Sequence, residues 1–243
     1  MNTIEKTFQL PSSGVFGGPK EITLRAMTTR EEKILLTARD FSVFERLVES
    51  CTVKPKDLNI GLLHQSDLMY LVFALRELTF GNTYSQEIVC PECGSKYESI
   101  IDIADMNLTF LDTESLDSKL KVKLPVSGDT LQLKLLSVGD IRKIDKMIKN
   151  KTAKGRLKDP EGYEIIVKLM ETIVSINDED FESQEYKQNY VETLNLRDLN
   201  VIQNTLADID FGLDTTNTIV CDKCGEEVEV RGLICPEFFH PSK

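Results

Sequence analysis

The chain of 243 residues (27.5 kDa) is 41% hydrophobic and 28% charged, proportions of a folded globular protein that exclude a disordered chain. Its 29 lysines and arginines against 40 aspartates and glutamates give a formal charge of −11, which argues against tight binding to nucleic acid or anionic lipid. The longest unbroken apolar run, residues 68–75, is too short for a membrane span, which needs about 20 residues.

The N-terminal segment, MNTIEKT, lacks the basic region and apolar stretch of a secretory signal, so we expect the chain to fold in a cytosol. Thiols stay reduced there. The six cysteines are therefore expected to act as metal ligands or free thiols rather than as a disulfide framework.

The first predicted element is a β-hairpin formed by residues 10–14 (LPSSG) and the alternating apolar residues Ile22 and Leu24. A helix is predicted next, because Thr29 and Glu32 have the spacing of a capping box.

A longer helix is predicted after a Ser66 cap, with Leu68, Leu71 and Leu75 on one face. It is followed by a first cysteine pair at residues 90–93.

The second half of the chain repeats this series. Residues 124–128 (LPVSG) precede alternating leucines at 131, 133 and 135, and Ser137 and Asp140 again have capping-box spacing. Further along, matching residues differ by 131 in number: Asp67 and Asp198, Leu68 and Leu199, Leu71 and Ile202, Leu75 and Leu206, Phe80 and Phe211, Cys90 and Cys221.

We therefore expect an α+β fold formed by internal duplication of a unit of β-hairpin plus helices. The first unit is predicted at residues 1–105 and the second at residues 106–243. Two such units, each burying an apolar face against the other, would bring equivalent turns together near a pseudo-twofold axis. A zinc-ribbon-like four-cysteine site formed from both halves would then join them.

Two cysteine pairs have the same form: Cys90-Pro-Glu-Cys93-Gly and Cys221-Asp-Lys-Cys224-Gly. Two residues between thiolates let one tight turn direct both sulfurs at one ion, and the glycine permits positive φ. Four thiolates make a closed tetrahedral shell without a position for water or substrate. We therefore expect one structural zinc ion per chain, held by Cys90, Cys93, Cys221 and Cys224.

The 127 residues between the pairs far exceed the roughly 15 to 20 of a common zinc ribbon. Closing such a loop costs roughly 4 kcal/mol plus a constant, whereas structural zinc contributes about 10 to 16 kcal/mol in small peptides. The free energy of zinc binding therefore exceeds the cost of closing the loop, provided that the fold aligns the two cysteine pairs. Metal-free buried thiols and a redox C-x-x-C site are the alternatives. A redox site normally opens a helix, whereas the residues after both pairs have an extended pattern.

The charges near the cysteines are mostly acidic, and the residues concerned are Glu87, Glu92, Glu98, Asp222, Glu226, Glu227 and Glu229, against Lys96, Lys223 and Arg231. Phosphate would be repelled there, so a nucleic-acid partner is not expected. A basic stretch lies elsewhere, at residues 142–158, and comprises Arg142, Lys143, Lys146, Lys149, Lys151, Lys154, Arg156 and Lys158. It is either a solvated helix end and loop or a docking surface for an acidic partner.

Few residues are suited to catalysis. His64 and His240 are the two histidines; we expect His64 in a loop or partly buried, and His240 to pack with the apolar tail that includes Cys235. Residues 14–18 are glycine-rich but lack the Gly-Lys-Ser/Thr that binds phosphate. We therefore expect no enzyme activity, no catalytic residues and no small-molecule substrate.

Several segments in order resemble the baseplate hub proteins of T-even-like, contractile-tailed bacteriophages. These are LPSSG at residues 10–14, ITLRAMTTREEKIL at 22–35, SDLMYLVFALR at 66–76, FGNTY at 80–84 and CPEC at 90–93. The resemblance covers residues 8–100 most clearly and includes both hub subunits and hub assembly proteins.

The resemblance implies a non-enzymatic structural or assembly role in the baseplate hub, with other hub or tail proteins as partners. It implies a location in the host cytoplasm during assembly and in the tail baseplate of the virion. Two other functions are kept as alternatives: a zinc-ribbon nucleic-acid-binding protein that uses the basic stretch, and a thiol redox enzyme that uses one cysteine pair.

Overall fold

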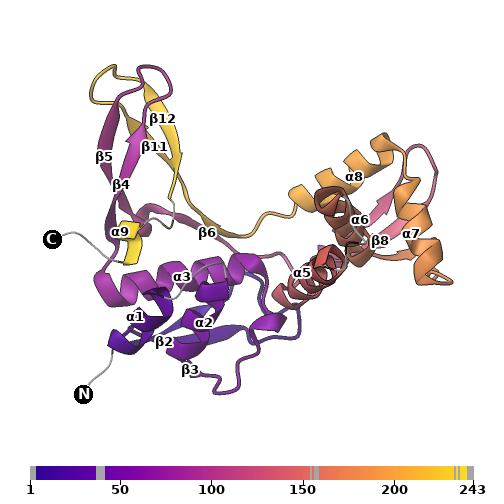
Figure 1. Ribbon diagram of the computed structural model, residues 1–243, viewed down its shortest axis with the longest axis horizontal. Helices are drawn as coiled ribbons and strands as arrows, with labels where there is room; N and C mark the ends of the chain where they lie inside the picture. Colours follow the sequence, from indigo (N-terminus) through magenta and orange to yellow (C-terminus); the bar gives the residue numbers. More distant parts are fainter. Residues whose placement is uncertain are drawn as a thin grey trace.

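The computed structural model describes residues 4–36, 42–153, 155, 159–232, 234 and 236–239. Five residues singled out in the sequence lie outside this part of the chain: Lys154, Arg156, Lys158, Cys235 and His240. The fold is mixed α and β, with several small antiparallel sheets and helices packed on them (Figure 1). No helix within the described ranges is both long enough and apolar enough to cross a bilayer.

The first lobe is an antiparallel sheet of order β1-β2-β3 covered by three helices (Figure 1). Its elements are β1 (Glu5–Gln9), β2 (Glu21–Arg25), α1 (Thr29–Leu36), α2 (Ser42–Cys51), β3 (Thr52–Lys54), the 3-10 turn η1 (Ile60–Leu62) and α3 (Gln65–Phe80). Alternating residues of β2 supply the core, because Ile22 and Leu24 are fully buried against α3 residues that include Leu68 and Leu71.

The second lobe has a sheet of the same order and pairing, β7-β8-β9. Its elements are α4 (Leu116–Lys119), β7 (Lys121–Lys123), β8 (Thr130–Leu133), α5 (Val138–Ala153), α6 (Pro160–Thr172), β9 (Ile173–Ile176), α7 (Gln184–Glu192) and α8 (Leu196–Ala207). Leu131 and Leu133 are buried here as Ile22 and Leu24 are in the first lobe. In both sheets the register shifts between the second and third strands, immediately before Leu24 in β2 and Leu133 in β8.

Each lobe also contains a buried aspartate that ties the first hairpin to a later helix. Asp67 of α3 accepts hydrogen bonds from the backbone N–H groups of Ser12 and His64, both at 2.9 Å. Asp198 of α8 accepts them from Val126 at 2.8 Å and Ser127 at 3.1 Å. A carboxylate that accepts two backbone N–H bonds offsets the cost of its burial and fixes the hairpin turn against the helix.

The predicted caps are partly confirmed. The box of Ser137 and Asp140 is present at the start of α5, with reciprocal hydrogen bonds of 3.1 Å. The box predicted at Thr29 and Glu32 is wrong by one residue, because the Thr28 N–H donates to Glu31 Oε2 at 2.8 Å and the Thr28 hydroxyl oxygen accepts the Arg30 N–H at 3.3 Å.

The expected Ser66 cap is also wrong. His64 is instead the N-cap residue of α3, and its Nδ1 accepts the Ser66 N–H at 3.1 Å. The Asp67 side chain in turn accepts the His64 N–H at 2.9 Å, so the two residues form a capping box.

The two remaining hairpins form a head that stands on the first lobe (Figure 1). The elements of this part are β4 (Thr83–Val89), β5 (Lys96–Asp102), η2 (Ile103–Asp105), β6 (Asn107–Thr109), β10 (Gly212–Asp214), β11 (Thr216–Val220), β12 (Glu227–Arg231) and α9 (Pro236–Phe239). Strand β6 pairs with β10 as the chain leaves and re-enters this region. The hairpin β11–β12 therefore returns from the second lobe to share a core with β4–β5.

The buried hydrophobic residues of the described chain form two separate clusters. One hydrophobic cluster joins the first lobe with both head hairpins and includes Tyr84, Ile88, Val228, Val230 and Phe238. The other belongs to residues 111–211. The last part of the chain thus buries its apolar side chains on the first lobe rather than on the second.

A buried ion pair fixes α1 to the first sheet. The Glu31 side chain is 0% exposed and accepts hydrogen bonds from Arg25 (2.9 Å), Ser50 (2.6 Å) and Thr28 (2.8 Å). Burial alone would raise the pKa of Glu31, but these donors outweigh it and lower the pKa to about 2.

Glu31→Gln should destabilise the protein by about 3 kcal/mol at pH 7, because it removes the charged partner of Arg25 inside the fold. The folded pKa lies below the unfolded value of about 4.3, so the carboxylate stabilises fully above about pH 5, and the benefit is lost as the pH falls toward 2. Urea unfolding at pH 7 and pH 3 should show the two proteins converging at low pH. Glu32→Gln, at an exposed position, is the matched control and should change stability by less than about 0.5 kcal/mol.

Candidate metal centre

The two cysteine pairs occupy equivalent turns at the tips of the head hairpins. In the turn between β4 and β5, the Cys90 N–H donates to the Ser95 carbonyl at 3.0 Å and the Gly94 N–H donates to the Cys90 carbonyl at 2.9 Å. Gly94 has φ of 67°, a left-handed conformation that glycine adopts without steric cost.

The turn between β11 and β12 repeats this geometry. The Cys221 N–H donates to the Glu226 carbonyl and the Gly225 N–H to the Cys221 carbonyl, both at 2.8 Å, and Gly225 has φ of 76°. Both turns therefore direct their two sulfurs to the same side.

The four sulfurs meet between the hairpins. The Sγ atoms of Cys90 and Cys224 are 3.7 Å apart and those of Cys93 and Cys221 are 3.8 Å apart. All four lie within 4.8 Å of one another. The expected convergence of the two pairs is thus confirmed, and the four residues lie close enough together to hold a metal ion.

These distances can be compared with those of a four-thiolate zinc centre. Zinc–sulfur bonds of about 2.3 Å in a tetrahedron place the sulfurs about 3.8 Å apart along each edge. The distances from Cys90 to Cys224 and from Cys93 to Cys221 agree with this value. Each of these two distances joins a cysteine of one hairpin to a cysteine of the other, so an ion bound there would link residues far apart in the chain.

The sulfurs differ in their surroundings. Cys90 and Cys221 are buried, whereas Cys93 and Cys224 are exposed. The Ser95 hydroxyl lies 3.0 Å from the Cys93 sulfur and 3.6 Å from the Cys221 sulfur. This hydroxyl, followed by the backbone N–H groups of Cys224 and Lys223, lowers the pKa of Cys221 to about 6. Hydrogen bonding thus favours the metal-binding thiolate form at Cys221. At Cys224 the Glu226 N–H acts in the same direction, but desolvation and the three neighbouring sulfurs outweigh it and raise the pKa to about 12.

Ser95 was not singled out in the sequence. It directly follows Gly94 and is largely buried, whereas the equivalent position of the second turn is Glu226. The sequence signal that could have identified Ser95 is a small hydroxyl residue directly after a C-x-x-C-Gly turn, since its hydroxyl can donate to a thiolate of the neighbouring turn.

The elements after both turns are strands, β5 and β12, as the sequence pattern predicted. Neither cysteine pair stands at the start of a helix, where redox C-x-x-C thiols gain their reactivity. Cys51, at the end of α2, lies apart from the cluster in the first-lobe core, and burial raises the pKa of this thiol to about 12.

His64 is partly buried and lies next to two aromatic rings. Its ring stacks on Phe16 at 5.4 Å and lies 4.7 Å from the Phe211 ring, measured between centroids. Burial lowers the pKa of His64, so the ring is neutral at pH 7 and accepts the Ser66 N–H. The sequence-based expectation of a partly buried residue agrees with this position.

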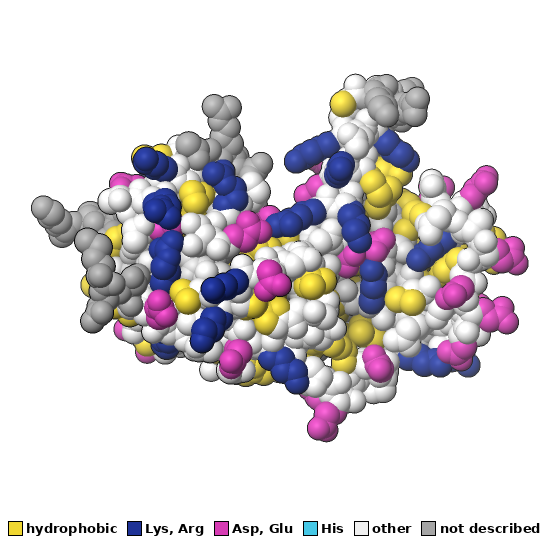
Figure 2. Space-filling model, turned by 90° about the horizontal axis from the view of Figure 1, so that it is seen from below, with side chains coloured by type: hydrophobic (Ala, Val, Ile, Leu, Met, Phe, Trp, Pro, Cys, Tyr) yellow, Lys and Arg dark blue, Asp and Glu magenta, His cyan; other side chains and the backbone are white. Residues whose placement is uncertain are grey.

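Basic side chains stand among acidic and apolar ones on the face shown in Figure 2. In the described part of the basic stretch, Arg142 pairs with Glu45 of α2, and Lys151 donates to the Tyr163 hydroxyl.

A comparison with known protein families gives the family of the chain. The chain matches, over residues 1–240, the family described as T4 bacteriophage base plate protein, and it belongs to that family. Neither the search of curated proteins nor that of solved structures found a match.

Gly94→Ala and Gly225→Ala should each lower the free energy of unfolding by about 1 to 2 kcal/mol, because alanine pays a steric cost at positive φ. A Cβ at either position meets no atom within 4 Å, so the cost comes from the backbone alone. Gly94→Asn should cost less, since asparagine tolerates this conformation. Thermal unfolding of the three variants checks this, and equal stability of wild type and both alanine variants would contradict it.

Proposed function

We propose that the chain binds one structural zinc ion through Cys90, Cys93, Cys221 and Cys224. The observation that carries this proposal is the approach of the four sulfurs from two equivalent turns to within 4.8 Å of one another, with two of the distances between the hairpins at 3.7 and 3.8 Å. Four protein ligands fill the coordination shell, so the ion would stabilise the head and leave no position for a substrate.

The protein is, in this proposal, a non-enzymatic structural or assembly component of the baseplate hub that acts through contacts with other tail proteins. Membership of the baseplate family supports a structural or assembly role. The closed cysteine site and the use of His64 as a helix cap support a function without catalysis. Assembly in the host cytoplasm, followed by a place in the tail baseplate, is part of the same proposal.

We further infer that the chain arose by internal duplication, with units at residues 1–105 and 106–243. Equal sheet order, equivalent register shifts and the paired aspartates Asp67 and Asp198 support this inference. The caps of α3 and α8 agree as well, because His64 and Asn195 each accept the N–H of the second residue after them. Each unit supplies one sheet and one hairpin of the head.

Cys93→Ser and Cys224→Ser should each reduce bound zinc well below one per chain and cost several kcal/mol of stability, because three thiolates remain. Native mass spectrometry, which reports zinc content and oligomeric state together, checks this. Cys51→Ala is the control: it should lose stability through its buried position but keep one zinc per chain. Wild-type protein that carries no zinc after expression in zinc-supplemented medium would overturn the assignment.

The assembly role is tested by co-purification from infected cells. A tagged chain should retain baseplate or tail proteins of the phage that encodes it, and a chain that purifies alone in the presence of all of them would contradict the role. Salt-dependent retention on DNA, lost when Lys146 and Lys149 become Gln, would instead favour the nucleic-acid-binding alternative.

A further inference from the structure

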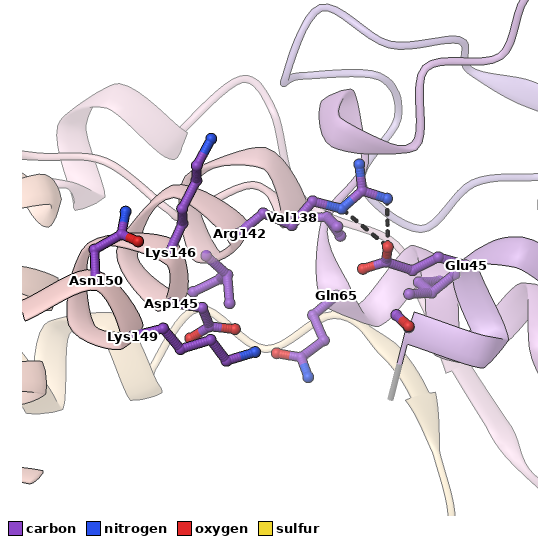
Figure 3. Close-up of a pocket in the computed structure, with 11 residues that line it drawn as sticks. Glu45, Gln65, Val138, Arg142, Asp145, Lys146, Lys149 and Asn150 are labelled. Atoms are coloured by element: carbon purple, nitrogen blue, oxygen red, sulfur yellow. Dashed lines mark hydrogen bonds and ion pairs between the residues drawn. The ribbon is translucent and has the colours of Figure 1, made fainter. Parts of the chain in front are cut away.

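A groove lies between the two lobes, with α5 on one side and α2 and α3 on the other (Figure 3). Its volume is about 560 Å³. Among the described residues, the wall from α2 and α3 contributes Ser42, Glu45 and Gln65. Because the first lobe supplies one wall and the second lobe the other, anything bound here contacts both lobes.

The floor of the groove is apolar. Leu68 and Val138 are buried beneath it, and Ile141 lies beside them on α5. This composition suits the apolar side chains of a bound segment, which would lose contact with water on entering.

The α5 wall is basic. Arg142, Lys146 and Lys149 follow one another at i, i+4 and i+7 and so lie on one face of the helix. Arg142 is already paired with Glu45 across the groove, and Figure 3 shows this contact as dashed lines. Within the described part of the chain, neither Lys146 nor Lys149 forms an ion pair, and Figure 3 shows Lys149 extended toward Gln65 of the opposite wall.

We infer that this groove binds an amphipathic, acidic helical segment of a partner protein, with apolar side chains on the floor and carboxylates facing Lys146 and Lys149. The combination of apolar floor and basic rim is the pattern by which grooves recognise such helices. A polynucleotide fits less well, because its phosphate backbone would use the basic wall but has no apolar face for Leu68, Val138 and Ile141. The inference rests on the proposed assembly function and names the chemistry of one partner.

The experiment uses the full chain and three fluorescent helical peptides of equal length. The first carries leucines at i, i+3 and i+4 spacing flanked by glutamates, the second replaces the glutamates with lysines, and the third replaces the leucines with serines. Fluorescence anisotropy should show binding of the first peptide alone. Lys146→Glu combined with Lys149→Glu should weaken this binding at least about 10-fold, and Ile141→Gln should weaken it as well.

Lys56→Glu combined with Lys123→Glu is the matched control. Both lysines are exposed and neither lines the groove, so the net charge changes equally while binding should stay within about 2-fold of wild type. Far-UV circular dichroism confirms that each variant is folded before binding is compared.

Three outcomes would overturn the inference: no binding of the acidic amphipathic peptide, equal binding by wild type and the Lys146 and Lys149 variant, or preference for a single-stranded oligonucleotide over that peptide. The first two leave the assembly role intact if tail proteins still co-purify with the tagged chain. Failure of co-purification together with retained peptide binding would instead reject the assembly role alone.

Discussion

The arrangement of the whole chain depends on the meeting of the two cysteine turns. Their sulfurs approach within 4.8 Å although 127 residues separate the pairs, so the chain must leave the first lobe, build the second and return. The return is held by more than the cysteines: the Gln86 side chain donates to the Arg231 carbonyl at 3.1 Å, and the Tyr84 and Phe238 rings lie 5.0 Å apart. An ion at the centre would add its binding energy to an interface that is already apolar and hydrogen-bonded.

The junction between the lobes is compact where the backbones touch and open where the groove lies. A Cβ added to Gly139 would come within 2.8 Å of the Gly61 carbonyl oxygen, so this contact requires glycine. Nearby, the Val138 N–H donates to the Leu63 carbonyl at 2.8 Å, and Arg142 reaches Glu45. The start of α5 is thus fixed to the first lobe, while the groove extends along the helix as far as Asn150.

Much of the site could be predicted from the sequence, because C-x-x-C-Gly turns are local and a constant offset of 131 relates residues 67–90 to residues 198–221. The choice of Thr29 and Glu32 over Thr28 and Glu31 was wrong because both pairs have capping-box spacing. What decides between them is the burial of Glu31 against Arg25 and Ser50, residues brought close by the fold. Similarly, the extended pattern after the second cysteine pair predicted a strand, but not that its residues Val228 and Val230 would join the core of the first lobe. Contacts between distant segments leave no local pattern.

The return of the last hairpin has a consequence for synthesis on the ribosome. The β4–β5 hairpin emerges long before β11–β12, and at about 5 to 20 residues per second the interval is on the order of 10 s. During that time Tyr84 and Ile88 lack their cover and Cys90 and Cys93 lack their counterparts. The nascent β4–β5 hairpin therefore keeps part of its apolar face uncovered and its two cysteines without the other two ligands until translation delivers the second turn.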